Sequence, residues 1–229
     1  MKISVIVPLY NQRLYVGEAL GSIFTQTRPA DEVILVDDGS TDGGGESLGR
    51  WRDKIHLILQ ENRGVSAALN RGLRAATGDA IAFLDADDLW AEDKLRRQSA
   101  LLDAEPAIDG VFGYIRQFAS PGTMLKFDIP EAPQPGICAA TLLVRNSAFE
   151  HFGWFDEGRR TAGFVPWYSR AAALGLRTRM MSDLLAYRRV HGQNTGIVRR
   201  DDLQEDSLLA LKQALDIRRK RASTGGAGA

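Results

Sequence analysis

The stretch IAFLDADDLW, residues 81–90, decides how this chain folds. Four apolar residues run directly into three carboxylates, those of Asp85, Asp87 and Asp88. A short apolar run of this kind is typical of a strand that is covered on both faces of a sheet. Neighbouring carboxylates raise the cost of ionising one another unless a positive partner lies among them. The sequence therefore predicts a buried strand that ends in a cation site.

The residues up to 104 alternate between expected strands and expected helices. Apolar runs predict strands at 3–10, 32–38, 54–60 and 79–85, and helical spacing predicts helices at 14–27, 46–53, 64–77 and 91–104. Such alternation predicts a parallel sheet with helices on both faces, in which ligands bind beyond the carboxyl ends of the strands. Three of the strands end in polar clusters, namely PLYN (8–11), DDGSTD (37–42) and DADD (85–88). We therefore expect the three clusters to share one cleft.

Beyond residue 105 the pattern is less regular. We expect strands at 110–118 and 137–145, a Pro-rich loop at 129–136, a helix at 167–175, strand pieces around a turn at 177–190, and an amphipathic helix at 203–221 with Leu208, Leu211 and Leu215 on its apolar face. The sequence contains no internal repeat and no flexible linker. Residues 1–104 and 105–221 are therefore expected to be two halves of one α/β domain, with a disordered tail at 222–229.

The composition narrows the classes of protein to consider. The 229 residues include 29 basic and 29 acidic ones, and this balance gives no bulk electrostatic reason to expect nucleic acid as a partner. The single cysteine, Cys138, excludes an internal disulfide and fits a reducing compartment. No apolar run reaches the ~18–20 residues needed to span a bilayer, and no signal-peptide cleavage site is apparent. We expect a cytoplasmic protein.

The acidic cluster at 85–88 suits a hard divalent cation. Mg²⁺ and Mn²⁺ prefer oxygen ligands and leave coordination positions for substrate phosphates. In a strand, Asp85 and Asp87 would point the same way, so one could hold the ion while the other reaches a sugar hydroxyl. The alternative is structural, with Asp88 capping the next helix and the other acids facing solvent. The two other clusters at the same edge favour the cation site.

The remaining clusters also allow two readings. In DDGSTD, Asp38 is the better candidate for a contact with a base or ribose, although Asp-Gly-Ser is also favourable turn chemistry. Gly64 stands at an expected helix start, where backbone N–H groups attract anions. Ser66 and Asn70 lie four residues apart on that helix and can share its cleft side, although ordinary capping explains them equally well.

Several other chemistries lack their sequence signals. The chain has no Gly-x-x-x-x-Gly-Lys-Ser/Thr phosphate loop, no Gly-x-Gly-x-x-Gly fingerprint, no serine nucleophile elbow and no Cys/His metal spacing. Its three histidines, at 56, 151 and 191, exclude a His-rich metal site. An aspartyl-phosphate enzyme would favour Thr or Val directly after the acids, where Leu89 stands.

Four ordered motifs resemble the family 2 glycosyltransferases, which are nucleotide-diphosphosugar transferases with the GT-A fold. The motifs are SVIVPLYN (4–11), VDDGSTD (36–42), NRGVSAALNRGL (62–73) and GDAIAFLDADD (78–88). The match is dense up to residue 104 and continues through GWFDE (153–157) and YRRVHGQN (187–194). The resemblance implies a Rossmann-like, mostly parallel sheet with helices on both faces. It also implies a nucleotide-sugar-binding half at 1–104 and an acceptor-side half at 105–221, with a smaller acceptor-side extension of the sheet.

The resemblance further implies a metal-dependent, inverting transfer of a sugar from a nucleotide diphosphate, expected to be uridine diphosphate, to an acceptor hydroxyl. The nucleotide-binding residues would be Pro8, Tyr10, Asn11, Asp38, Gly64, Asn70, Asp85, Arg188 and Arg189. Asp87, with Asp85 and His191, would hold Mn²⁺ or Mg²⁺. The two arginines would neutralise phosphate charge.

One position departs from the family pattern. Relatives with a YRR-x-H-G-x-N segment usually carry Asp or Glu, the expected general base, directly before the Trp of the WYSRA-like helix. This chain has Pro166 there, which is tolerated in a helix first turn but cannot accept a proton. Asp156 and Glu157 are the nearest acids in sequence and are the candidate catalytic residues.

Two further hypotheses stay open beside an active transferase. A donor-binding homologue with weak or no transfer activity would keep the cleft and lack the base. A nucleotidyltransferase would need a Gly-rich N-terminal loop with a basic residue, which VPLYNQRLY does not supply. The acceptor is a glycan, a lipid-linked molecule or a protein. The basic end of the last helix, IRRKRA, is either a solvated helix end or a peripheral contact with an anionic membrane. A homodimer is also open.

Overall fold

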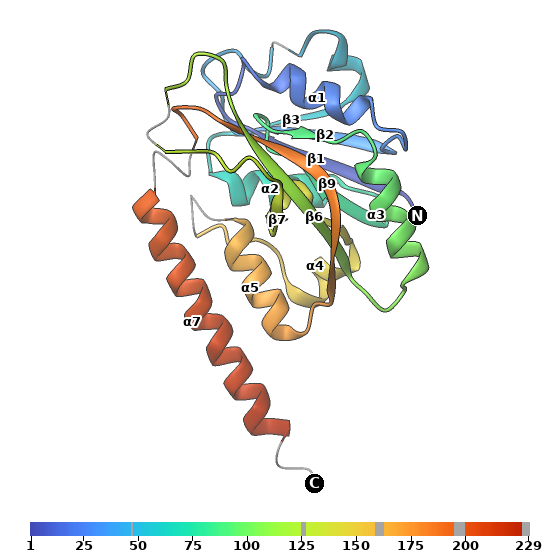
Figure 1. Ribbon diagram of the computed structural model, residues 1–229, viewed down its shortest axis with the longest axis vertical. Coiled ribbons are helices and arrows are strands. Elements are labelled where there is room, and N and C mark those ends of the chain that lie inside the picture. The colour runs from blue at the N-terminus through green and yellow to red at the C-terminus, as the bar shows by residue number, and fades with distance from the viewer. Residues whose placement is uncertain (47, 125–126, 159–162, 195–199, 226–229) are drawn as a thin grey trace.

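The computed structural model describes residues 1–46, 48–124, 127–158, 163–194 and 200–225. Within these ranges nine strands form one sheet in the order β3-β2-β1-β4-β8-β6-β9-β5, with β7 paired to β6 (Figure 1). The strands are β1 (Ile3–Leu9), β2 (Glu32–Asp37), β3 (His56–Leu59), β4 (Ala80–Phe83), β5 (Leu89–Trp90), β6 (Gly110–Ala119), β7 (Gln134–Gly136), β8 (Leu143–Arg145) and β9 (Thr178–Val190). Strands β3, β2, β1 and β4 run parallel, so their carboxyl ends meet at one edge.

Helices cover both faces of the sheet. They are α1 (Val16–Phe24), α2 (Val65–Ala75), α3 (Lys94–Ala104), α4 (Ser147–Phe152), α5 (Phe164–Leu174) and α7 (Arg200–Gly225), with 3₁₀ turns η1 (Gly49–Lys54) and η2 (Ala139–Thr141). Val5 of β1 belongs to the core cluster that includes residues of α1 and α3, whereas Ile6 belongs to the cluster that includes residues of α2 and α5. Because successive side chains of a strand point to opposite faces, β1 must be apolar at nearly every position. The predicted α/β fold class is confirmed.

Several expected elements differ from the observed ones. Residues 177–190, expected as strand pieces around a turn, form the single strand β9. β9 pairs with both β6 and β5, and register shifts near Phe112 and Tyr114 absorb the irregularity. The strand expected at 137–145 divides into η2 and β8, and the expected loop at 129–136 contributes β7. The helix expected at 46–53 is replaced by the 3₁₀ helix η1, which contains Gly49, a residue that disfavours an α-helix. Helix α4 has no counterpart among the expected elements.

The last helix, α7, is longer than expected and packs through a different face. It continues to Gly225, into the segment 222–229 expected to be a tail, and residues 226–229 lie outside the described part. α7 packs against α5 and extends beyond it (Figure 1). Among the residues of α7 whose burial is described, Ala210 and Ala214 are buried, whereas Leu208, Leu211 and Leu215 of the predicted apolar face are exposed. The small alanines let the two helices approach, and this leaves the leucines outside.

Candidate active site

The ends of β1 and β2 are joined by hydrogen bonds through Asn11. The Asn11 side-chain oxygen accepts the backbone N–H of Thr41 at 2.8 Å, and the Asn11 backbone N–H donates to Ser40 Oγ at 3.1 Å. Asn11 has a φ of 52°, a left-handed conformation that asparagine tolerates better than most residues. Tyr10, next to it, is 48% exposed. The predicted residues Tyr10 and Asn11 therefore lie on a rigid rim at the carboxyl edge of the sheet.

Pro8 and Asp38 lie at the same two strand ends. Pro8 is half-buried in β1 and pairs in register with Val36 of β2. The Asp38 carboxylate is buried and accepts hydrogen bonds from Gln60 Nε2 at 2.7 Å and from the backbone N–H groups of Arg63 and Gly64 at 2.8 Å each. Asp38 thus fixes the loop that leads into α2. The Gly64 N–H, which was expected to attract an anion, donates to the carboxylate of Asp38 in this structure.

Asn70 binds the segment that carries the two predicted catalytic acids. Its side chain accepts the Phe155 N–H at 3.1 Å and donates to the Phe155 carbonyl and to Glu157 Oε1, both at 2.9 Å. Asn70 is 2% exposed, so this role occupies the side chain that was expected to face a nucleotide. Its contacts connect α2 to residues 155–157.

The two candidate bases differ in their surroundings. The Glu157 carboxylate contacts Arg63 at 3.0 Å and Arg74 at 3.4 Å. The hydrogen bond from Asn70, together with these arginines, lowers the pKa of Glu157 against the opposing effect of its partial burial. Asp156 is exposed and accepts the Gly158 N–H at 3.0 Å. Glu157 is therefore a weakened proton acceptor that is held in ion pairs.

The acidic residues 85–88 form a turn and do not continue the strand. β4 ends at Phe83, and the Asp88 N–H donates to the Asp85 carbonyl at 3.1 Å. Asp88 is buried and accepts the backbone N–H of Arg189 at 2.9 Å, so it neither caps α3 nor faces solvent. The expectation that Asp85 and Asp87 share one side of a strand is therefore wrong. The turn separates the three carboxylates into different environments.

Crowding shifts the protonation of two of these acids. Asp85 is exposed at the turn, but surrounding protein atoms desolvate it, and this effect and the Asp87 charge raise the pKa of Asp85 to about 6. Burial, followed by the charges of Asp87 and Asp85, raises the pKa of Asp88 well above its usual value. The exposed Arg188 opposes both pKa shifts, which places its positive charge beside the cluster.

The side chains of Asp87 and His191 contact each other at the carboxyl edge of the parallel strands. His191 Nε2 lies 3.0 Å from Asp87 Oδ2, and His191 is 4% exposed. The Gln193 backbone N–H lies 3.2 Å from His191 Nδ1. A carboxylate and an imidazole in contact fit two ligands of a divalent cation. Among the described residues no group of three His, Cys, Asp or Glu side chains is placed so that it could hold a metal ion.

Arg189 has a different place from the predicted one. Its guanidinium lies 4.8 Å from the ring centres of both Tyr15 and Phe118. It donates to the Asp87 carbonyl at 3.0 Å and to Glu18 Oε2 at 2.6 Å, and the residue is 4% exposed. These contacts use the group that was expected to neutralise phosphate. Arg189 instead supports the turn that carries Asp87.

Sequence reasoning missed one residue of this site, Asn194. Its Nδ2 donates to Asp87 Oδ2 at 3.2 Å and to the Arg189 carbonyl at 3.0 Å, while its Oδ1 accepts the His191 N–H. Asn194 therefore holds both cation-binding candidates at once. The signal was present, because Asn194 ends the YRRVHGQN segment three residues after His191.

Pro166 is buried in the first turn of α5. Next to it, Trp167 is also buried and donates its indole N–H to the Gly153 carbonyl at 2.8 Å. At the start of the helix, a Cβ added to Gly163 would lie 3.2 Å from Ser66 Oγ of α2. The position where relatives of this type usually carry the base is therefore part of a packed helix start beside α2.

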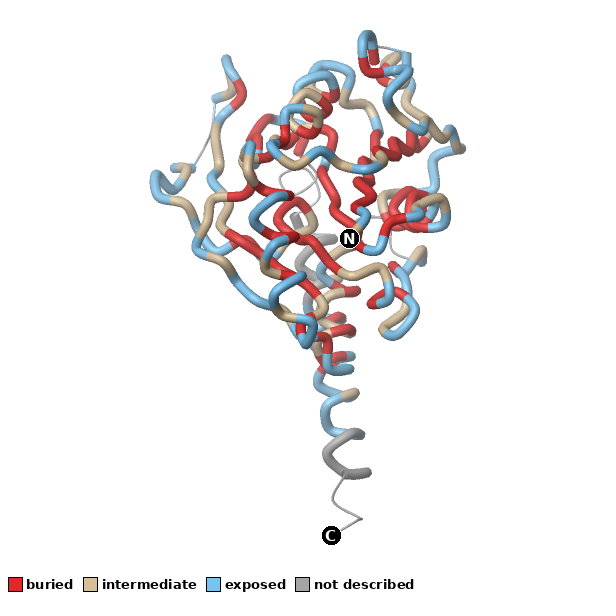
Figure 2. The backbone as a smooth tube through the Cα atoms, turned by 90° about the vertical axis from the view of Figure 1, so that its right-hand side faces the viewer, coloured by how far each residue is buried: buried red, intermediate tan, exposed pale blue. Residues whose placement is uncertain are grey.

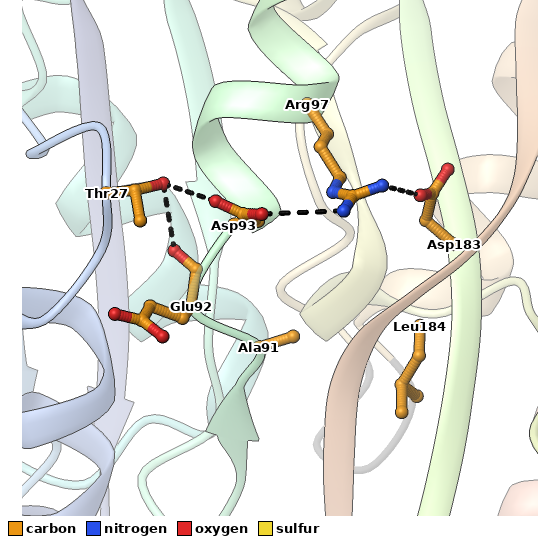
Figure 3. A pocket seen from close by; sticks show the side chains of 7 residues that line it. All are labelled: Thr27, Ala91, Glu92, Asp93, Arg97, Asp183 and Leu184. Atoms are coloured by element: carbon orange, nitrogen blue, oxygen red, sulfur yellow. Dashed lines mark hydrogen bonds and ion pairs between the residues drawn. The ribbon is translucent and has the colours of Figure 1, made fainter.

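A separate hollow of about 440 Å³ lies between the loop after α1, the start of α3 and β9 (Figure 3). Its polar groups contact one another. Thr27 donates to Asp93 at 2.7 Å, and Arg97 pairs with Asp93 at 3.4 Å and with Asp183 (Figure 3). None of the predicted site residues lines it. The strand ends, where the acids gather, are the better candidate for the active site.

The α/β sheet with helices on both faces, and the acidic turn at the carboxyl edge of its parallel strands, agree with the GT-A fold that the sequence resemblance implied. Residues 4–156 match the model of the family described as Glycosyl transferase family 2. The chain belongs to this family.

Individual relatives agree with the family assignment. TuaG of Bacillus subtilis, provisionally assigned as a teichuronic acid biosynthesis glycosyltransferase, is 43% identical over 100 residues, which cover 42% of this chain and 40% of TuaG. EpsE of the same species, provisionally named a glycosyltransferase, is 34% identical over 182 residues, which cover 70% of this chain and 62% of EpsE. The chain thus spans less than two thirds of the length of these relatives.

Solved structures show the same fold at low sequence identity. Staphylococcus aureus TarS 1-349 in complex with UDP-GlcNAc has a TM-score of 0.72 at 23% identity, covering 95% of this chain and 70% of that one. The mannosyltransferase PcManGT of Pyrobaculum calidifontis, in complex with GDP-Man and Mn²⁺, has a TM-score of 0.67 at 24% identity, covering 100% of this chain and 76% of that one. The expected family and fold are confirmed.

Proposed function

We propose that this protein is an inverting glycosyltransferase that moves a sugar from a nucleotide diphosphate, uridine diphosphate by preference, to an acceptor hydroxyl with the help of Mn²⁺ or Mg²⁺. The observation that carries the proposal is the contact of Asp87 with His191 at the carboxyl edge of the parallel strands. The donor complexes of TarS and PcManGT, which are structurally similar proteins, support a nucleotide-sugar donor.

The roles of the residues follow from charge. Asp87 and His191 would hold the cation, and the bound cation would stabilise negative charge on the departing diphosphate. Arg188 is exposed beside the acidic turn and adds a second positive charge. Arg189 is left out of this set, because Glu18 and the Asp87 carbonyl occupy its guanidinium. Tyr10 and Asn11 form the rim where the base and ribose would lie.

The acceptor side needs a proton acceptor. As the sugar becomes oxocarbenium-like, an acceptor hydroxyl attacks from the face opposite the leaving group, and a carboxylate within about 2.6–3.2 Å takes its proton. Glu157 is poorly suited, because Asn70 and two arginines hold it and its pKa is lowered. This leaves Asp156 as the proposed base.

A donor-binding homologue without transfer activity is the second candidate function. The observation that favours it is the buried Pro166, which stands where relatives of this type usually carry the base. Under this alternative the donor and the cation still bind, and transfer is slow or absent. In that case Pro166→Asp should raise the transfer rate.

The test measures binding and turnover separately. Calorimetry of uridine diphosphate with Mn²⁺ should show affinity that falls in the presence of a chelator and in Asp87→Asn. The control Asp103→Asn, an exposed acid on α3, should keep the wild-type affinity. Affinity that ignores both the chelator and Asp87→Asn would contradict the cation site.

Transfer is tested with a panel of nucleotide sugars and simple acceptors, and the anomeric configuration of the product is read by NMR. If Asp156 is the base, Asp156→Asn should lower transfer about 10²–10⁴-fold without weakening donor binding. If Asp156→Asn leaves turnover unchanged, Asp156 is not the base. If the product retains the configuration of the donor, the reaction is not inverting.

A further inference from the structure

Helix α7 presents an exposed face that contains apolar and basic side chains. Leu208, Leu211 and Leu215 are 67%, 55% and 51% exposed. At 3.6 residues per turn, Leu211 and Leu215 fall within about 60° of Leu208 on the helix circumference. Lys212, Arg218 and Arg219 are also exposed and flank these leucines within about 80° of Leu208. We call these six side chains the leucine face.

The leucine face is separate from the contact that holds α7 to the body. Ala210 and Ala214 are 2% and 9% exposed, and they lie on the opposite side of the helix from Leu208. α7 contacts α5, and its lower part extends beyond the body of the protein (Figures 1 and 2). The leucines are therefore not needed for the packing on α5, and large exposed apolar side chains in a row mark an interaction surface.

The charges on the leucine face favour one kind of partner. Over residues 206–220 this side of the helix carries three cations and one carboxylate, because Asp216 lies about 80° from Leu208, as far as Arg218 does, whereas Asp206 lies about 160° away. Asp216 is the nearer of the two, and its contact with Arg219 is a loose 3.9 Å ion pair on the helix edge. A second copy of the chain would offer the three cations only this one carboxylate on its own matching face. A membrane-like surface, with an apolar interior and anionic headgroups, would suit both the leucines and the basic side chains.

We propose that α7 lies flat on an anionic membrane surface, with its leucine face inserted at the headgroup boundary. Within the described residues no helix is long and apolar enough to cross a membrane. Lys212, Arg218 and Arg219 extend outward from the leucines toward lipid phosphates, as long basic side chains do at such boundaries. This proposal requires neither donor nor acceptor, so it can fail or succeed independently of the proposed transferase activity.

Vesicle binding of the whole 229-residue chain tests the proposal. Sedimentation is compared between vesicles of phosphatidylcholine alone and vesicles that also contain phosphatidylglycerol. We expect binding to the anionic vesicles that weakens with salt. Leu208→Gln with Leu211→Gln and Leu215→Gln should abolish it. Changing Lys212, Arg218 and Arg219 to Gln should lower the partition coefficient by about fivefold for each charge removed.

The matched control is Leu209→Gln. Leu209 is 50% exposed on the same helix but lies about 100° from Leu208, outside the leucine face. It should bind vesicles like the wild type, and unchanged thermal melting of every variant would show that the fold is intact. Equal binding to neutral and anionic vesicles, or no binding to either, overturns the proposal. One further result would overturn the proposal. It is a wild-type protein that does not bind vesicles but forms a concentration-dependent dimer, when the triple leucine variant no longer forms that dimer.

Discussion

Asn194 is the residue on which both candidate cation ligands depend. It donates to the Asp87 carboxylate and accepts the backbone N–H of His191. Partners that orient metal ligands typically change metal affinity 10–100-fold when they are removed. We expect Asn194→Ala to weaken Mn²⁺ binding by about that factor in calorimetry with uridine diphosphate. Gln193→Ala, an exposed neighbour, should leave the affinity unchanged. Equal affinities for the two variants would show that Asn194 does not orient the ligands.

The buried guanidinium of Arg189 contributes to the stability of the fold. The guanidinium lies between Tyr15 and Phe118 and pairs with Glu18, whose side chain is 61% exposed. Removing the guanidinium leaves the Asp87 carbonyl without this hydrogen bond and leaves a gap between the rings of Tyr15 and Phe118. Arg189→Met should therefore cost about 1–3 kcal/mol of unfolding free energy, because the Asp87 carbonyl loses its hydrogen bond. Glu18→Gln keeps an oxygen that can accept from the guanidinium and should cost no more than about 1 kcal/mol, since the Glu18 carboxylate is largely solvated. Urea denaturation measures both, and comparable losses would contradict the assignment.

Lys94 is a fully buried cation that should make stability depend on pH. Its Nζ donates to Gln98 Oε1 at 2.7 Å and to the Leu142 carbonyl at 3.3 Å. Desolvation lowers the pKa of Lys94 to about 7, a shift that the nearby Cys138 opposes. The unfolded chain, with a lysine pKa of about 10.4, then binds more protons than the folded protein between about pH 7 and pH 10. The free energy of unfolding should rise with pH in this window, by at most about 1.4 kcal/mol per pH unit.

Lys94→Met removes the titrating group, so the comparison isolates its contribution. The variant should be more stable than the wild type near pH 7, and the difference should narrow as the pH rises. Urea denaturation of both proteins at several pH values in the window gives the two profiles. Parallel profiles would mean that Lys94 keeps an ordinary pKa in the folded protein.

At the residue scale, the sequence located the acidic turn but not what holds it. The apolar run into Asp85, Asp87 and Asp88 identifies a strand end with local pattern alone. The surroundings of Arg189 come from Tyr15, Glu18 and Phe118, which lie in segments far apart in sequence. No local pattern distinguishes a phosphate-binding arginine from one buried by such distant contacts, so the sequence could not predict the surroundings of Arg189.

Among the helices, the close approach of α2 to β1 depends on a glycine. A Cβ added to Gly72 would lie 2.4 Å from Ile6 Cγ2, a buried atom of the strand. Gly72→Ala should therefore destabilise the protein by about 1–3 kcal/mol, although alanine is the better helix former. Gly17 of α1 is exposed, and an added Cβ meets nothing within 4 Å. Gly17→Ala should stabilise by about 0.5–1 kcal/mol. Thermal melting should give opposite signs, and a shared sign would mean that the α2–β1 contact relaxes freely.

Some elements were predictable from a clear apolar pattern in their own sequence, whereas others depend on the elements that pack against them. The buried strands β1, β2 and β4 and the helix α2 were predicted close to their observed bounds, because both faces of the sheet are covered and the apolar pattern is continuous. β9 was expected to be broken, since MMSDLLAY mixes polar and apolar residues. Pairing with β6 on one side and β5 on the other keeps it straight enough to continue. The leucines of α7 were expected inside because they form the strongest apolar stripe, but the alanines fit α5.

At the scale of the whole molecule, residues 1–104 depend on the residues that follow them. The Trp90 indole N–H donates to the Ala140 carbonyl at 2.8 Å. The buried side chain of Gln98 donates to the carbonyls of Val111 and Thr141 at 2.6 and 2.8 Å. β4 pairs with β8, and β5 pairs with β9. Without residues 105–229, the edge of β4 and these polar groups would lose their partners, and unsatisfied buried groups cost about 1–3 kcal/mol each.

A fragment of residues 1–104 should therefore not fold by itself, although it contains most of the motifs of the family. The whole chain should unfold in a single cooperative transition that circular dichroism and tryptophan fluorescence report at the same urea concentration. Trp51 and Trp90 lie in the first half, and Trp154 and Trp167 in the second, so fluorescence samples both. A cooperative melt of the isolated fragment, or two separated transitions in the whole chain, would mean that the two halves are independent domains. The expected single transition would instead mean that the donor edge is stabilised by strands that arrive about a hundred residues later, which is why Asp87 and His191 can meet across 104 positions of sequence.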